Sequence, residues 1–195
     1  MYTWRITILV LLALTQLGGC APLMVGGAAA TGGAMALDRR TPGAFIDDER
    51  IEWTIRNAIR QDEKLSRQSN VSVISYDGIV LLSGETPTEA LRARAAEHAR
   101  EVEKVRRVHN ELVIAAPSSL MSRSSDTSIT ARVKTRLLGI RDVEGFDGTK
   151  VKVKTENGTV FLMGKLYRKE AEAATEAARQ VNGVQRIVRL FEYLD

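Results

Sequence analysis

Few of the residues that carry chemistry occur in this chain. Its 195 residues include 1 cysteine and 2 histidines. A lone cysteine excludes an internal disulfide framework, and neither His98 nor His109 has another nitrogen or sulfur ligand at the spacing of a metal site. The serine run at 118–128 lacks a partner that would activate a nucleophile, and no glycine-rich phosphate loop occurs. The sequence therefore predicts neither an enzyme nor a protein that binds a metal or a cofactor.

Aromatic residues are also scarce, at 5%. Any core must therefore be built from Val, Ile, Leu and Ala. A hydrophobic share of 44% beside a charged share of 27% is that of an ordinary globular protein. The net charge of +4 is mildly basic and selects no class of partner by itself.

The longest apolar run stands near the start of the chain. One positive charge precedes the run at 6–14 and small residues follow it, a pattern that predicts a signal peptide over residues 1–19. The next residues, LGGC at 17–20, resemble a bacterial lipobox. That resemblance implies cleavage before Cys20 and acylation of its sulfur and its new amino group. Ala21 in the following position implies sorting to the outer membrane of a Gram-negative cell.

Residues 20–46 are expected to form a lipidated tether, because the part at 21–37 is uncharged and rich in Gly and Ala. As a random coil it would reach roughly 30 Å. The alternative is that this stretch lies in or against the bilayer. Two or more acyl chains anchor a protein stably, so nothing else in the sequence is needed merely to hold it on a membrane.

A first module of order α-β-β-α-β is predicted over residues 47–115. Isoleucines four residues apart indicate an amphipathic first helix, with Asp47 or Asp48 as its N-cap. Two β-rich runs then flank Asp77-Gly78, the pair typical of a type I′ hairpin turn.

The same order returns over residues 126–195, after a serine-rich linker at 116–125. Its hairpin turn is Asn157-Gly158, at an offset of 80 from the first turn. Glycines recur at the same offset, and they are expected to mark the turns and the places where a strand hands over to a helix: Gly78, Gly84, Gly158 and Gly164. The chain therefore contains a tandem duplication.

The predicted fold class is α+β, with two helices on one face of a small three-stranded mixed sheet in each module. The hairpin makes two strands antiparallel, and the helical crossover makes the last strand parallel. A second set of apolar residues points to the opposite face: Ile79, Leu81, Phe161 and Met163. Packing between the modules or a partner protein would cover that face.

A module of this order, with the hairpin core V.V…(D/N)G.V.L.G, resembles the BON domain. The segment VKVKTENGTVFLMG in the second copy is especially close. Two such modules behind a lipobox and a Gly/Ala tether resemble the dual-BON-domain outer-membrane lipoproteins. The resemblance implies a periplasm-facing lipoprotein that supports envelope integrity and binds anionic phospholipid through its second module. Stress-induced periplasmic proteins among the BON relatives make envelope stress a natural context.

The two modules differ in charge. Residues 47–115 hold 11 basic and 13 acidic side chains, a net of −2, whereas residues 123–195 hold 14 and 10, a net of +4. The positive second module suits an anionic lipid surface. Members of this family can carry an aromatic residue where the second module's first helix starts. Here that position is Ser128, and Trp53 lies instead in the first module.

The candidate lipid-binding residues follow from these patterns: Ser128, Ile129, Arg132, Arg136, Lys150, Lys152 and Lys154. The two arginines are four apart on one helix face, and the three lysines alternate along one expected strand, so their ammonium groups should leave one face of the sheet. An alternative is that these are solvated polar faces, with the lysines protecting a strand edge.

A different class of function stays open beside lipid binding. It is a protein-interaction scaffold at the outer membrane that regulates cell-wall hydrolases or the barrel-assembly machinery. Nucleic acid would suit the positive charge, but a secreted lipoprotein has no access to it.

Overall fold

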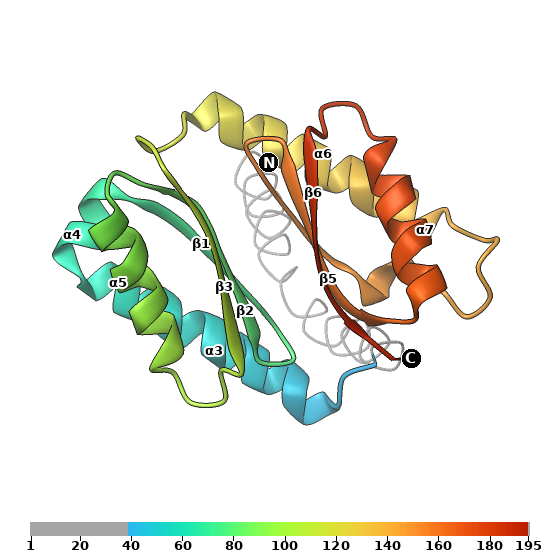
Figure 1. The fold of residues 1–195 in the computed structure, drawn as a ribbon, viewed down its shortest axis with the longest axis horizontal. Helices are drawn as coiled ribbons and strands as arrows, with labels where there is room; N and C mark the ends of the chain where they lie inside the picture. The colour runs from blue at the N-terminus through green and yellow to red at the C-terminus, as the bar shows by residue number, and fades with distance from the viewer. Residues whose placement is uncertain (1–38, 195) are drawn as a thin grey trace, which may run out of the picture. The chain divides into compact units, whose positions relative to one another are not determined.

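The computed structural model describes residues 39–194 (Figure 1). The signal peptide, Cys20 and nearly all of the expected tether lie outside these residues. The first module has the predicted order with one short additional helix: α3 (Pro42–Gln61), α4 (Glu63–Gln68), β1 (Asn70–Tyr76), β2 (Ile79–Thr86), α5 (Glu89–Arg100) and β3 (Arg107–Ile114). The second module repeats the order with a short 3-10 helix: α6 (Leu120–Leu138), η2 (Gly148–Lys150), β4 (Lys152–Glu156), β5 (Thr159–Leu166), α7 (Arg168–Arg179) and β6 (Arg186–Tyr193).

Each sheet is mixed, as predicted. The strand orders are β1-β2-β3 and β4-β5-β6, with the hairpin pairs antiparallel and the last strand parallel to its neighbour. Both hairpin turns have positive φ at both central residues: 51° and 75° at Asp77 and Gly78, and 47° and 70° at Asn157 and Gly158. These values confirm the type I′ turns.

Both first helices begin earlier than the sequence predicts. Thr41 caps α3 by accepting the Ala44 N–H at 3.1 Å, and Pro42 occupies the first helical position. Asp47 and Asp48 therefore lie in the second turn, and the prediction that one of them is the N-cap is wrong. Helix α6 begins at Leu120, so the segment expected as a linker is helical over its second half.

One face of each sheet is buried beneath its two helices (Figure 1). Ile51, Ile55 and Ile59 of α3 pack on β1 and β2 together with the alanines of α5. The equivalent residues of α6 and α7 cover the second sheet. Full burial of each such aliphatic side chain contributes about 1.5–3 kcal/mol, so this face holds each module together.

The opposite faces of the two sheets pack against each other. Tyr76, Ile79 and Leu81 of the first module form one buried cluster with Phe161 and Met163 of the second. The sequence left two alternatives for these residues, packing between the modules and a partner protein. The structure shows packing between the modules.

Gly84 and Gly164 lie inside β2 and β5, two residues before each strand ends, rather than at a handover to a helix. Each allows a close approach of backbone. A Cβ on Gly164 would stand 2.7 Å from the Lys150 carbonyl oxygen, and one on Gly84 would stand still closer to the Asn70 oxygen. Gly84 also has φ +117°, which side chains rarely tolerate.

Candidate functional site

The outer surface of α6 is the strongest candidate site in the second module. Asp126, Ile129, Val133 and Leu137 are buried on one side of this helix. The opposite side is an exposed row, here called the α6 crest: Leu120, Ser124, Ser128, Ala131, Thr135 and Leu138. Most of its side chains are small, so the helix backbone can approach a flat surface closely.

Basic residues border the crest on both sides. At 100° per residue, Arg132 and Arg136 lie along one border and Arg123 and Lys134 along the other. All four are exposed, and none makes an ion pair within the described part of the chain. Asp126 is the only acidic residue of α6, and it is buried. The exposed charge of this helix is therefore entirely positive and without counter-charge.

The seven predicted site residues do not form a single site. Ser128, Arg132 and Arg136 lie together on the exposed surface of α6. Ile129 does not join them, because its side chain is buried in the module core. The three lysines lie elsewhere.

The prediction that these lysines share one open strand face is wrong. Lys150 belongs to η2 and donates to the Gly145 carbonyl oxygen at 2.6 Å. Lys152 and Lys154 do share a face of β4, but it is the face that meets the first module. Lys152 donates to Glu52 Oε1 at 2.7 Å across that interface, and Lys154 pairs with Glu156 at 3.1 Å.

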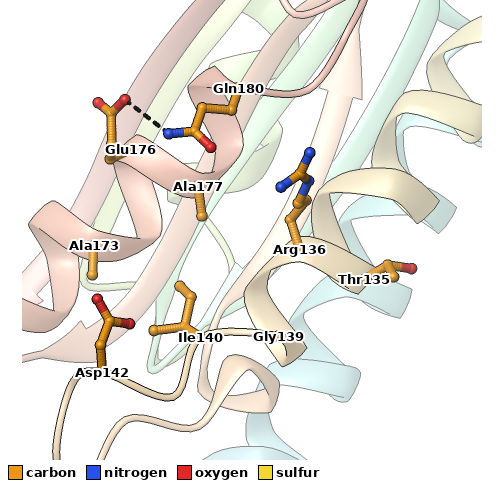
Figure 2. Close-up of a pocket in the computed structure, with 9 residues that line it drawn as sticks. All are labelled: Thr135, Arg136, Gly139, Ile140, Asp142, Ala173, Glu176, Ala177 and Gln180. Carbon is orange, nitrogen blue, oxygen red and sulfur yellow. Dashed lines mark hydrogen bonds between the residues drawn. The ribbon is translucent and has the colours of Figure 1, made fainter.

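A groove of about 390 Å³ runs between the C-terminal end of α6 and α7 (Figure 2). Arg136 lies on its α6 side, and Glu176, hydrogen-bonded to Gln180, lies on its α7 side. Asp142 contributes a second carboxylate. The uniformly positive surface of α6 therefore ends at this groove.

Sequence reasoning missed a buried aspartate that holds the hairpin turn in each module. Asp48 accepts the backbone N–H groups of Asp77 and Gly78 at 2.7 and 2.9 Å, and the Ser75 hydroxyl at 2.5 Å. Asp126 accepts those of Asn157 and Gly158 at 2.9 and 3.0 Å. These N–H groups lie in the turn, outside the hydrogen bonds that pair the two strands. A carboxylate from the first helix of the module accepts a hydrogen bond from each of them. The sequence did contain one signal of this role. Asp126 follows Asp48 by 78 residues, the same distance that separates Ile129 from Ile51.

Two consecutive arginines ahead of α3 reach different modules. Arg39 forms a two-point ion pair with Glu170 of α7 at 2.6 and 2.8 Å, and its guanidinium lies over the Tyr167 ring. Arg40 pairs with Asp48 at 2.6 Å. Burial raises the pKa of Glu170, but hydrogen bonds from Arg39 and from the Tyr167 N–H outweigh it, so that pKa lies below its usual value.

Carboxylates also gather where the turn of the second module meets the first. Glu85 accepts a hydrogen bond from the Asn157 side chain. Burial, with the nearby carboxylates of Glu85 and Asp126, raises the pKa of Glu156 above its usual value although Lys154 opposes the shift. The folded protein therefore favours the neutral form of the Glu156 carboxyl over its charged form.

This shift predicts a pH-dependent effect of Glu156→Gln. A carboxyl whose pKa is higher in the folded state stabilises the fold at low pH, and that contribution is lost as pH rises through the folded pKa. The glutamine variant, which stays neutral, should therefore melt at a higher temperature than the native chain near pH 7. The difference should vanish near pH 4, as followed by circular dichroism. A lower melting temperature for the variant at pH 7 would show that the pair with Lys154 dominates.

Residues 39–194 contain neither a cluster of metal ligands nor a helix that could span a membrane. In that range no three His, Cys, Asp or Glu side chains gather in a way that could hold a metal ion. No helix in the same range combines the length and the apolar character needed to cross a bilayer.

Comparison with known proteins agrees with the modular fold. A family model of the BON domain matches residues 47–116 and 125–195. The chain is 37% identical to the outer membrane lipoprotein DolP of Haemophilus influenzae over 92% of its own length and 91% of that protein's. It is 35% identical to a 21 kDa hemolysin of Actinobacillus pleuropneumoniae over 81% and 80%. It is 28% identical to the osmotically-inducible protein Y of Escherichia coli over 74% and 72%. The chain belongs to the BON-domain family and carries two BON domains in tandem.

Proposed function

We propose that this chain is a lipid-anchored protein of the outer membrane, facing the periplasm, whose second module binds anionic phospholipid and supports envelope integrity. The observation that carries the proposal is the surface of α6, where every exposed charge is basic and none has an ion-pair partner within residues 39–194. Two relatives add support, since one is named an outer membrane lipoprotein and another a hemolysin. Cys20 would carry the acyl chains.

The acyl chains and α6 would perform different tasks. Two or more chains hold a protein on a bilayer stably. Each basic residue near an anionic surface adds about 1 kcal/mol, screened by salt. The four basic residues of α6 can therefore orient the second module on the membrane or favour anionic lipid around it. Leu120 and Met121 are 79% and 84% exposed at the start of the helix, and they can enter the apolar boundary.

A protein partner would have to bind a surface other than the apolar faces of the two sheets. The apolar sheet faces, for which packing between the modules and a partner protein were the two alternatives, are packed against each other. The α6 surface therefore favours the lipid over the scaffold hypothesis.

Vesicle sedimentation tests this proposal. The chain from residue 20 onward with Cys20→Ala should bind phosphatidylglycerol-rich vesicles and not phosphatidylcholine vesicles, more weakly as salt increases. Replacing Arg132 and Arg136 with glutamine should weaken binding roughly 30-fold, because two charges worth about 1 kcal/mol each are lost. Neutralising two exposed, unpaired arginines of the first module, Arg100 and Arg107, is the control with matched net charge.

Two outcomes would contradict the proposal. One is binding that is indifferent to lipid charge. The other is an equal loss in the α6 variant and its control, because that would reflect net charge rather than a site. Lys152→Ala should leave binding unchanged, since Lys152 lies at the interface between modules.

A further inference from the structure

The first helix of the first module, α3, has an exposed row equivalent to the α6 crest. This row, here called the α3 crest, occupies the same positions at the offset of 78, and all its side chains are exposed except the half-buried Asn57: Ile46, Arg50, Trp53, Asn57 and Arg60. Trp53 is 59% exposed and Ile46 57% exposed. These two side chains lie seven residues apart on one helix surface and belong to neither apolar cluster of the first module.

The charges beside these apolar side chains are mostly positive. Arg50 makes no ion pair with any residue that the structure describes, and Arg60 donates to the Asn57 side chain at 3.0 Å. The acidic residues of α3 are largely occupied elsewhere, since Asp48 and Glu52 are buried and Asp47 pairs with Lys104. Glu49 is the one exposed acid of this helix without an ion pair.

Tryptophan and isoleucine among arginines on a helix surface suit the boundary of an anionic bilayer. Tryptophan side chains favour the level of the lipid headgroups, and guanidinium groups attract anionic lipid. We propose that the α3 crest is a second contact surface for an anionic bilayer, so that one molecule can bridge two lipid surfaces. The bridging half of this inference rests on the proposed function of α6.

The packing of the modules makes the two contacts independent. Helix α3 covers the outer face of the first sheet and α6 covers the outer face of the second. The inner faces of the sheets meet in the shared apolar cluster. The two crests therefore belong to opposite outer layers, and one flat bilayer cannot touch both. Simultaneous contact requires two membranes, or two parts of a curved one.

Trp53 supplies a direct probe. The sequence has 2 tryptophans, and the other, Trp4, precedes residue 20. In the chain from residue 20 onward with Cys20→Ala, the emission of Trp53 should shift to the blue on addition of vesicles of equal parts phosphatidylglycerol and phosphatidylcholine, and brominated acyl chains should quench it. The shift should persist in the Arg132→Gln, Arg136→Gln variant, since that change leaves α3 intact.

Vesicle clustering, followed by light scattering, tests the bridge. The native chain should cluster the same vesicles, with a maximum at intermediate protein and a decline when the vesicle surfaces saturate. Trp53→Ala with Ile46→Ser should lose clustering while still sedimenting with vesicles through α6. The α6 variant should likewise bind without clustering. Trp53→Phe should restore part of the clustering, and circular dichroism confirms that each variant is folded.

The outcomes separate the two proposals. An unshifted Trp53 spectrum, or clustering that survives Trp53→Ala with Ile46→Ser, overturns the α3 contact and leaves α6 standing. Binding lost with the α3 changes and untouched by the α6 changes overturns both the bridge and the proposed role of α6. Clustering that keeps rising with protein would indicate self-association and also overturn the bridge. Binding of Trp53 to a protein with no response to vesicles would assign the α3 crest to a protein partner instead.

Discussion

Replacing Asp48 with alanine is expected to lower the free energy of unfolding by about 3–5 kcal/mol. The substitution removes the acceptor for two turn N–H groups and the Ser75 hydroxyl. It also removes one ion-pair partner of Arg40, whose side chain is 5% exposed. Breaking a buried ion pair by removing one carboxylate is among the costliest single changes in a protein. Urea unfolding followed by circular dichroism measures the loss.

The second module provides the matched variant. Asp126 accepts the two equivalent turn N–H groups but pairs with no arginine among residues 39–194. Asp126→Ala should therefore cost only about 2 kcal/mol, the penalty for unsatisfied donors. Equal losses in the two variants would show that the Arg40 pair contributes nothing. A loss below about 1 kcal/mol in both would show that the turns do not depend on these carboxylates.

Gly84→Ala is expected to be at least as severe, at about 4 kcal/mol or more, with a low yield of soluble protein. Its Cβ would collide with the Asn70 carbonyl oxygen, which belongs to the paired strand and cannot move aside without breaking the ladder. The positive φ adds backbone strain. Thermal unfolding of the purified variant, or its fraction in the soluble lysate, measures the effect.

Gly164→Ala is the matched control for that prediction. Gly164 also lies close to a carbonyl oxygen, that of Lys150, but less close than Gly84 lies to Asn70, and it lacks the positive φ of Gly84. Its substitution should cost clearly less than Gly84→Ala, and a similar cost for both would show that neither the positive φ nor the closer approach at Gly84 adds to the loss. A Gly84→Ala variant that folds with nearly native stability would contradict the close approach itself.

Local patterns were enough to predict the modules. The Asp-Gly and Asn-Gly pairs require positive φ wherever they form a tight hairpin, so the turn type follows from two residues. The isoleucines of α3 recur every four residues, and this spacing identifies the buried side of the helix before the surface it packs on is known. The duplication then assigns the same fold to the second module.

Contacts between distant elements were not predictable in this way. Asp48 reads as an N-cap because acids favour the first helical turn, but its partners lie about thirty residues away in the hairpin. The alternation of Lys152 and Lys154 placed them on one face correctly. Which face meets the other module depends on docking, and no periodicity encodes that. Ile129 shows the reverse, since it was predicted to bind lipid although its four-residue spacing from Val133 and Leu137 is typical of the buried side of a helix.

Arg39 and Arg40, ahead of α3, also bear on how the protein would respond to a pulling force on the preceding chain. A pull applied to the chain ahead of Arg39 is resisted first by its two-point pair with Glu170 in the second module, and only then by Arg40 and α3 in the first. The force is thereby shared between both modules before any helix is loaded along its axis. If α3 alone connected the preceding chain to the protein, the load would fall on that helix, whereas Arg39 and Arg40 connect it to both modules.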